Sequence, residues 1–559
     1  MTRIKTWARG LYNRDTIKQD AVAGVALGVV SVPDGLAGGL LAGVNPVFGL
    51  YGYLYGTLGG ALFTSATFMA VQATGAMAIV VADVPQVQGE SGERALFTLA
   101  IMTGVVMLVA GFFKLGSLLR WVSNSVMVGF INAVGVNIIL GQLDNFSGYE
   151  AEGANRVFRA FDLLLNLGQA HWGSMLIGAA TIALVIVLEK SRLGPLGMVV
   201  AIILTSSVVV IFGMEVAQLR SITDVPGSLP WVTLPDLGVV PSLIIPALAL
   251  AFVGLVQGAG ISGGMPNPDG EFPDPSQDFI GQGSGNVAAG LFSGMPVGGS
   301  MSASSLVKAA GAKSKLALII ASGVMALSVL LLSGAVGYIA MPALAGLLML
   351  VGYRTIKPDD IKAVWRTGAT QATVMSVTFV LTMIIPLQNA VMVGIGISVI
   401  LFVIKQSNRM TLKRWVPDEG GGRMKEVDPP IEVGVDEVII LQPYGSLFFA
   451  SAPVFDEALP EVLSESSNSV VIIRLRGKSD LGTTFMDVLA RYADALRSQD
   501  CKLMITYADD KVSDQLVATG ARVALGEENI YESDEWLGAT VRRANEDATN
   551  WISDNRRSD

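Results

Sequence analysis

The chain has 559 residues, of which 51% are hydrophobic and 15% charged, with a mean hydropathy of +0.55. This composition is typical of an integral membrane protein. Cys501 is the only cysteine and His171 the only histidine, which argues against disulfides, a cysteine-based metal site and histidine catalysis. The net charge is −9, and no basic patch with interleaved aromatic residues is present, so nucleic acid is not an expected partner.

Apolar segments of membrane-helix type recur from residue 20 to residue 404. The predicted spans, in chain order, are 20–43, 46–62, 73–86, 95–113, 118–140, 172–188, 197–213, 243–263, 278–294, 300–311, 314–338, 341–353, 369–386 and 388–405. Two of these fourteen, 73–86 and 300–311, are too short to cross a hydrocarbon core about 30 Å thick at about 1.5 Å per residue.

The basic residues that flank the spans predict the orientation in the membrane. With the amino terminus in the cytoplasm, twenty Lys and Arg residues fall in cytoplasmic segments, and only Arg94, Arg156, Arg159 and Arg220 fall in outer loops. We therefore expect a multi-pass protein of the plasma membrane with both termini in the cytoplasm. The acidic inner loop 267–278 fits this rule poorly.

Fourteen spans divide into two sets of seven, separated by the outer loop 213–241. Because each set has an odd number of spans, the second set must run upside down relative to the first, as an inverted repeat. The short third span is the irregularity that the two sets share. Short segments interrupted by Gly or Pro at corresponding positions in two halves indicate a transporter's binding site.

The stretch 294–311 is the clearer of the two irregularities. Pro296, Gly298 and Gly299 prevent a continuous helix, and the serines that follow can begin a new one. A half-helix that begins near the membrane midplane directs unpaired N–H groups and the positive end of its dipole towards a bound anion. The alternative is a surface loop between two full helices.

We predict two half-helix amino termini that meet near the midplane, at Gly75-Ala76-Met77 and at Ser300–Ser304. The extended residues before them, 68–72 and 295–298, could pair with each other. Such pairing would satisfy backbone groups that lipid would leave without partners.

The C-terminal part has a different composition. Through Trp415 the chain has 24 Lys and Arg against 20 Asp and Glu, a net +4; from Val416 onward it has 14 against 27, a net −13. This asymmetry predicts a separate soluble domain. We expect a linker at 416–430, a small β/α domain at 431–545 and a polar tail at 546–559. Strands are predicted at 438–441, 447–449, 470–474 and 503–506, and helices at 453–465, 483–498 and 511–519.

Several motifs resemble those of the SulP family of anion permeases. Val32-Pro33-Asp34-Gly35-Leu36-Ala37 is similar to the family's first-span Val-Pro-Gln-Gly-Met-Ala, and 45–51 to its Pro-Pro-Val-Tyr-Gly-Leu-Tyr. Segment 296–304, followed by Gly311-Ala-Lys313, resembles the tenth-span Pro-x-x-Gly-Ser-x-Ser-Arg-Ser signature with its trailing Gly-Ala-Arg/Lys. Residues 431–545 resemble a STAS domain.

The resemblance implies an α-helical transport domain at 20–415 after a cytoplasmic segment at 1–19. The fourteen spans would form a seven-plus-seven inverted repeat with a core domain (spans 1–4 and 8–11) and a gate domain (spans 5–7 and 12–14). The family also implies a cytoplasmic STAS domain and a homodimer.

Three positions depart from the family pattern. The tenth-span arginine falls on Ala303, and the eighth-span carboxylate falls on Gln257. The first-span glutamine is replaced by Asp34. An unpaired carboxylate near the midplane is costly, so Asp34 should either be protonated or lie against a bound cation. Our hypothesis is that Asp34 couples anion uptake to H⁺ or Na⁺; alternatively, it lines a wet vestibule or caps a broken helix.

The anion-binding candidates are the residues of the two half-helix amino termini and two uncharged donors near them. They are Gly75, Ala76, Met77, Ser300, Met301, Ser302 and Ala303, with Thr74 and Gln257. For the serines, helix packing is an equal alternative. In the STAS-like part, Ser479-Asp480-Leu481-Gly482-Thr483 aligns with the family's phosphoacceptor loop, but Gly482 occupies the acceptor position. Thr483 could substitute as a regulatory residue or could cap the helix that begins there.

We therefore expect a secondary transporter of small inorganic anions, with sulfate or bicarbonate implied by the resemblance, and neither an enzyme nor a cofactor-dependent protein. Cation-coupled symport with H⁺ or Na⁺ is the leading mechanism. The alternatives are an uncoupled exchanger or channel-like conductor, and a sensor that signals through the STAS domain.

Overall fold

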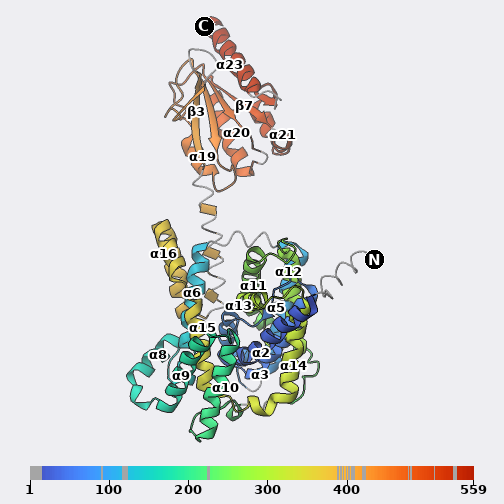
Figure 1. The fold of residues 1–559 in the computed structure, drawn as a ribbon. Coiled ribbons are helices and arrows are strands. Elements are labelled where there is room, and N and C mark those ends of the chain that lie inside the picture. The colour runs from blue at the N-terminus through green and yellow to red at the C-terminus, as the bar shows by residue number, and fades with distance from the viewer. Residues whose placement is uncertain are drawn as a thin grey trace. The chain divides into compact units, whose positions relative to one another are not determined.

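The computed structural model describes residues 16–558, with gaps at 90–91, 116–123, 223–226, 387–388, 391–392, 394–395, 398–399, 401–402, 405–409, 418–423, 476, 479–480, 509 and 533–537. The predicted segment 1–19 and the last predicted span, 388–405, therefore lie largely outside the described residues. The chain forms two compact units, Met1–Ser398 and Val399–Asp559. Figure 1 shows the first as a helical bundle and the second as a sheet with helices.

The first half of the membrane unit contains α2 (Ile17–Leu41), α3 (Pro46–Phe63), β1 (Val71–Gln72), α4 (Gly75–Ala82), α5 (Glu93–Phe112), α6 (Asn124–Leu140), α7 (Leu143–Ser147), α8 (Arg156–Leu165), α9 (Trp172–Glu189) and α10 (Leu196–Ile211). The second half contains α11 (Val240–Gly264), α12 (Pro275–Leu291), β2 (Gly298–Gly299), α13 (Met301–Ala309), α14 (Leu316–Val336), α15 (Met341–Thr355), α16 (Pro358–Thr367) and α17 (Ala369–Ile384). These bounds follow the predicted spans closely.

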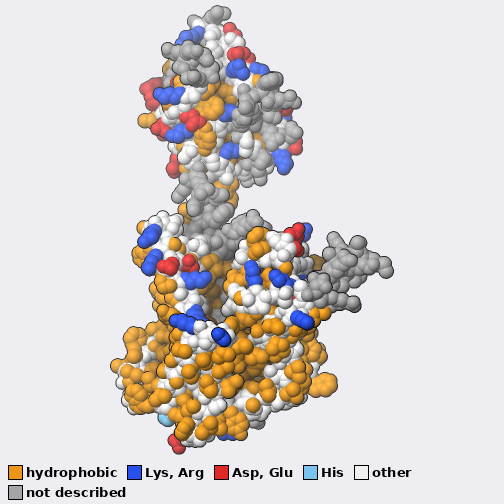
Figure 2. Space-filling view, in the orientation of Figure 1, with side chains coloured by type: hydrophobic (Ala, Val, Ile, Leu, Met, Phe, Trp, Pro, Cys, Tyr) orange, Lys and Arg blue, Asp and Glu red, His pale blue; other side chains and the backbone are white. Residues whose placement is uncertain are grey.

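Six helical segments in the described part of the chain are long and apolar enough to cross a membrane. They are α2, α5, residues 124–147, α9, α11 and α14. Figure 2 shows a broad hydrophobic surface on the helical unit, with Lys and Arg side chains gathered along one of its edges. The unit is therefore membrane-embedded, because lipid is the solvent that such a surface requires.

The two halves have the same irregular third element. The helices α4 and α13 have eight and nine residues, so each extends only about 12 to 14 Å. The strands before them pair antiparallel, Val71 with Gly299 and Gln72 with Gly298. The predicted pairing of the extended segments is thus confirmed, and the alternative of a surface loop at 294–311 is wrong.

Close contact between α11 and β2 depends on four glycines. A Cβ atom on Gly298 would lie 2.9 Å from the Cα of Gly254, and one on Gly299 would lie 2.9 Å from the Cα of Gly258. Real Cβ atoms do not approach backbone atoms so closely. The glycines therefore let a full-length helix lie directly against the strand that precedes α13.

In the described part of the membrane unit, three helices lie in segments for which no helix was predicted. The amphipathic helices α8 and α16 lie in the loops 141–171 and 354–368, and α7 is a short turn before α8. On α8, the side chains of Phe158, Phe161 and Leu165 are exposed. Their spacing of three and four residues is a helical pattern, but the stripe is too short to resemble a membrane span.

The membrane helices pack in two groups. The first group comprises α2, α3, α5, α11, α12 and α14, and the second comprises α6, α9, α10, α15 and α17. The half-helix α4 contacts α2 and α11 of the first group and α6 of the second, whereas the main contacts of α13 are with α2 and α11.

The C-terminal unit is a six-stranded sheet with the strand order β4-β3-β5-β6-β7-β8. Its strands are β3 (Thr411–Pro417), β4 (Met424–Val427), β5 (Val438–Tyr444), β6 (Val470–Arg474), β7 (Lys502–Ala508) and β8 (Ile530–Glu532), and its helices are α19 (Ala452–Ala458), α20 (Thr483–Arg497), α21 (Asp510–Ala518), α22 (Ala521–Leu525) and α23 (Ala539–Ser558). Strands β5 to β8 are parallel, and β3 is antiparallel to both of its neighbours. Alternate residues of β5 to β7 pack against α19–α22 on one face and against α23 on the other.

Three predictions for this unit are wrong. Residues 416–417 and 424–427 of the predicted linker 416–430 belong to the paired edge strands β3 and β4, and the β4 residues are largely exposed, so they lack an alternating apolar pattern. The predicted strand 447–449 is a turn: the Phe448 N–H donates to the Ser451 hydroxyl at 3.0 Å, after Gly445 ends β5 with a φ of +84°.

The predicted polar tail 546–559 is also wrong, since residues 546–558 belong to α23. The buried apolar residues of this helix form only a narrow stripe, at Val541, Ala544, Ala548 and Ile552, and Thr540 is buried beside them. The rest of the helix is polar, so its composition indicated a tail.

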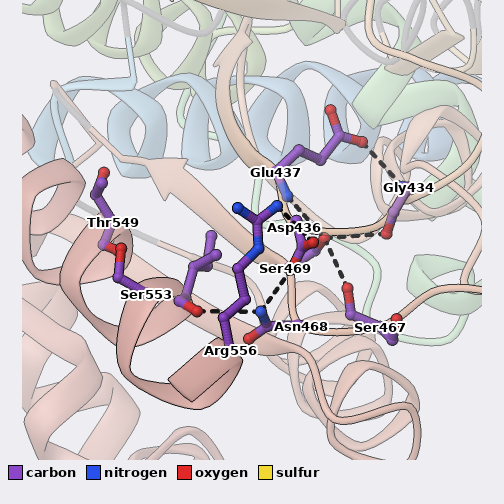
Figure 3. Close-up of polar contacts among 10 residues, drawn as sticks. Gly434, Asp436, Glu437, Ser467, Asn468, Ser469, Thr549, Ser553 and Arg556 are labelled. Atoms are coloured by element: carbon purple, nitrogen blue, oxygen red, sulfur yellow. Dashed lines mark hydrogen bonds and ion pairs between the residues drawn. The ribbon is translucent and has the colours of Figure 1, made fainter. Parts of the chain in front are cut away.

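Polar contacts also attach the end of α23 to the sheet (Figure 3). The guanidinium of Arg556 donates to Asp436 at 2.5 Å, and the Asn468 amide donates to Asp436 and to the Ile552 carbonyl. The hydrogen bond from Arg556, and then that from Asn468, lower the pKa of Asp436. The attachment is therefore complete at neutral pH and weakens only as the pH falls through that lowered pKa.

Candidate functional site

The site is organised around the short ladder of β1 and β2. Thr74 follows β1 and caps α4, accepting from the Met77 N–H at 3.4 Å. Ser300 follows β2 and caps α13, accepting from the Ala303 N–H at 3.4 Å. The antiparallel pairing thus holds two helix amino termini beside each other within the membrane unit.

The outer edges of this ladder are satisfied by buried side chains. Asn286 of α12 accepts from the Val297 N–H at 2.9 Å and donates to the Val297 carbonyl at 2.6 Å. Gln282 accepts from the Gly299 N–H at 2.9 Å. Directly before β1, the Ala70 N–H donates to the Ser304 hydroxyl at 3.1 Å. A two-stranded sheet can therefore exist inside a membrane protein, where water cannot satisfy its edges.

The two hydrogen bonds between the Asn286 side chain and the Val297 backbone form what we call the Asn286 clamp. We expect this clamp to be required for the stability of the folded chain. Asn286→Leu leaves the Val297 N–H and carbonyl buried without partners, at a cost of roughly 2–4 kcal/mol for the two groups together. The measurement is the midpoint of thermal unfolding of the full chain in detergent. Ser284→Ala is the matched control on the same helix, because the Ser284 hydroxyl donates to the Ile280 carbonyl of its own helix and to no other described residue. Equal midpoints for the two variants would contradict the clamp.

Four backbone N–H groups remain available at the two helix starts. No described residue accepts a hydrogen bond from the N–H groups of Gly75, Ala76, Met301 or Ser302. The side chain of Met301 is 46% exposed, whereas Ala76 is buried. Amino termini with free N–H groups are the usual protein device for binding an anion without a charged side chain.

Two residues of the predicted set do not offer free N–H groups. The amides of Met77 and Ala303 donate to the caps Thr74 and Ser300, so their groups are already used. The position where the family has arginine, Ala303, is itself buried. The N–H groups available to bind an anion are therefore those of the first two residues of each helix.

The structure brings Gln257 to the start of α4. The Thr74 hydroxyl donates to the Gln257 side-chain oxygen at 2.9 Å, which fixes the amide of Gln257 beside the cap. The hydroxyls of Ser300 and Ser302 lie 3.2 Å apart. Thr74, Gln257, Ser300 and Ser302 are thus close to the helix termini, whereas Ser304 is buried and serves the ladder.

The carboxylate of Asp34 in α2 accepts a hydrogen bond from the Tyr53 hydroxyl of α3 at 2.8 Å. Among the described residues, no Lys or Arg forms an ion pair with Asp34. The described part of the chain also contains no cluster of three or more His, Cys, Asp or Glu side chains that could hold a metal ion. Sequence reasoning missed Tyr53, because Tyr51, Tyr55 and Thr57 place other hydroxyls in the same span and nothing in the pattern distinguishes one from another.

In the C-terminal unit, Thr483 is the first residue of α20, and the capping position before it is occupied by Gly482. The side chain of Thr483 is exposed. The alternative of Thr483 as a helix cap is therefore wrong. Ser479 and Asp480 of the same loop lie outside the described residues.

Comparison with known proteins shows the family. The model of the sulfate permease family matches residues 17–378, and that of the STAS domain matches residues 430–533. YvdB of Bacillus subtilis (strain 168) is 24% identical over 529 residues, which are 93% of this chain and 97% of that protein. The bicarbonate transporter BicA of Picosynechococcus sp. is 24% identical over 470 residues, 79% of this chain and 83% of that protein.

Solved structures show the same fold. The structure of murine Slc26a9, an anion transporter in the inward-facing state, matches with a TM-score of 0.83 at 18% identity, over 97% of this chain and 94% of that one. The transmembrane domain of a cyanobacterial BicA matches with a TM-score of 0.59 at 21% identity, over 70% of this chain and 99% of that one. The predicted helical membrane fold of inverted repeats with a C-terminal STAS domain is confirmed.

The named relatives are transporters and not enzymes, in agreement with the prediction. The family model covers more than half of the chain, and its match lies on the helices that build the two half-helix termini. This protein belongs to the sulfate permease family and carries a C-terminal STAS domain.

Proposed function

We propose that the protein is a secondary transporter that binds a small inorganic anion between the amino termini of α4 and α13. The observation that carries this proposal is the set of four available N–H groups at Gly75, Ala76, Met301 and Ser302. Thr74 and Gln257 add uncharged polar groups beside them. Because no fixed cation stands at Ala303, binding depends on backbone dipoles and remains weak enough for release during turnover.

Transport would occur by movement of one helix group against the other. The group with α2, α3, α5, α11, α12 and α14, together with both half-helices, corresponds to the proposed core, and the group with α6, α9, α10, α15 and α17 to the proposed gate. Gly75 supports this division, since a Cβ atom there would lie 2.5 Å from the terminal methyl of Ile138 in α6. The gate thus closes directly over the start of α4, while the start of α13 is exposed.

Asp34 is the proposed coupling residue. Its carboxylate lies on a membrane helix and has a hydroxyl partner in Tyr53 but no ion-pair partner among the described residues. A proton or Na⁺ that neutralises Asp34 would make entry of an anion into the same core more favourable. This arrangement favours symport with H⁺ or Na⁺ over uncoupled exchange.

Sulfate and bicarbonate are the proposed substrates, since relatives are named for bicarbonate transport and the family for sulfate. The basic residues of the predicted inner loops support a plasma-membrane protein with both termini in the cytoplasm. The family resemblance supports a homodimer, and a STAS domain in which the exposed Thr483 is a candidate regulatory residue.

The test is uptake of labelled sulfate and labelled bicarbonate by the full chain in proteoliposomes, with an imposed inward H⁺ or Na⁺ gradient. We expect saturable uptake of one of these anions, stimulated several-fold by one of the gradients, and none in protein-free liposomes. Large anion currents without saturation would indicate a channel. Tight anion binding without flux would indicate a sensor, and either result would overturn the proposal.

A further inference from the structure

An ion pair joins the far end of half-helix α4 to the short helix α8. The Arg156 guanidinium lies 2.8 Å from the Asp83 carboxylate. Asp83 ends α4, where its N–H donates to the carbonyls of Ile79 and Val80, and Arg156 is the first residue of α8. Their side chains are only 16% and 20% exposed, so the pair is less screened by solvent than an ordinary surface ion pair.

The two partners belong to different helix groups. Helix α4 carries the site at its other end; it packs against α2 and α11 of the proposed core and also against α6 of the proposed gate. Helix α8 packs on α6 and α17, and the side chain of Arg156 lies against Gly141 directly after α6. A second ion pair, between Arg159 of α8 and Asp144 of α7, stays within the group of α6.

The pair therefore bridges the boundary across which movement is proposed. In this structure α4 packs against α6, and the start of α4 is covered, while the start of α13 is exposed. Access to the site from the side of Asp83 requires α4 to separate from α6. Since α8 stays with α6, that separation pulls Asp83 away from Arg156.

We propose that Asp83 and Arg156 form a latch that keeps the site closed on the side of Asp83 and must open in each transport cycle. The inference rests on the proposed transport by relative movement of the two helix groups. The latch positions α4 and does not contact the anion. Breaking it separates two largely buried opposite charges, which favours re-closure once the anion has been released.

Reversible cross-linking tests whether the latch must open. The chain has Cys501 as its only cysteine, so Cys501→Ser supplies a cysteine-free background. In Asp83→Cys/Arg156→Cys, a short bis-methanethiosulfonate cross-linker should reduce sulfate or bicarbonate uptake at least tenfold, and a thiol reductant should restore it. The matched control is Asp144→Cys/Arg159→Cys, which cross-links two residues of one group and should keep its uptake. Full uptake by the cross-linked Asp83/Arg156 variant would overturn the latch.

A second measurement needs no transported substrate. On the Cys501→Ser background with Ala76→Cys, a membrane-impermeant thiol reagent applied from the side of Asp83 should label several-fold faster when Arg156→Gln is added. Asp83→Arg/Arg156→Asp should return the labelling to the slow rate, because the swapped charges can pair again. Equal rates in all three backgrounds would overturn the latch. Absence of uptake by the wild type would instead contradict the proposed function.

Discussion

Met301→Pro is expected to raise the KM for anion uptake by roughly 10- to 100-fold. The substitution deletes one of the four available N–H groups at the half-helix termini and leaves the charge of the site unchanged. A hydrogen bond to a charged group contributes about 1.5–3 kcal/mol, and about 1.4 kcal/mol corresponds to a factor of ten.

The backbone at this position can accept proline. Met301 is the first residue of α13, where proline is favoured and where its missing N–H breaks no helix hydrogen bond. Ser300 before it has φ −92° and ψ 110°, which is compatible with a following proline. The substitution should therefore act on the anion and not on the helix.

Met301→Ala is the matched control, because it removes the half-exposed side chain and keeps the N–H. We expect its KM to stay within about twofold of the wild type. The measurement is the concentration dependence of labelled sulfate or bicarbonate uptake in proteoliposomes. An unchanged KM for Met301→Pro would show that the amino terminus of α13 does not bind the transported anion.

Asp34→Asn is expected to abolish the stimulation of uptake by a cation gradient while uptake without a gradient continues. The amide cannot take up a proton or compensate the charge of Na⁺, so the energetic link between cation and anion is lost. Asparagine has nearly the same shape and can still accept the hydrogen bond from Tyr53. The measurement is the ratio of initial uptake rates with and without an inward H⁺ or Na⁺ gradient.

Tyr53→Phe distinguishes the contribution of the Asp34 carboxylate from that of its hydrogen bond with Tyr53. It removes the hydrogen bond to Asp34 and keeps the carboxylate, so gradient stimulation should persist with a changed dependence on cation concentration. If Asp34→Asn keeps the stimulation of the wild type, Asp34 is not the coupling residue and instead lines a vestibule or caps the broken helix.

The sequence alone determined the class of fold and the position of the two half-helices at which the anion site is proposed. Apolar run lengths, the Gly and Pro interruptions at 294–311 and the flanking serines are local signals, and the same local forces decide where a helix starts and stops. The two half-helices, α4 and α13, and their extended leaders were therefore predictable without coordinates. The family motifs lie on these same segments.

Only the tertiary structure decided which side chains meet. The contacts of Asp34 with Tyr53 and of Thr74 with Gln257 join separate helices, and helix packing, which the sequence pattern does not specify, brings them together. The clamp of Asn286 on Val297 and the ion pair of Asp83 with Arg156 are of the same kind.

The helices and strands that were not predicted from the sequence were missed for a related reason. The helices α8 and α23 have only narrow apolar stripes on otherwise polar surfaces, and β4 is an exposed edge strand, so none of them has the long apolar run that marks a membrane span or a buried core element. Their stability comes from contacts with the rest of the fold, such as the packing of Ala544 and Ala548 on the sheet. A sequence determines an element by itself where the forces that form it are local, and requires the folded structure where they are not.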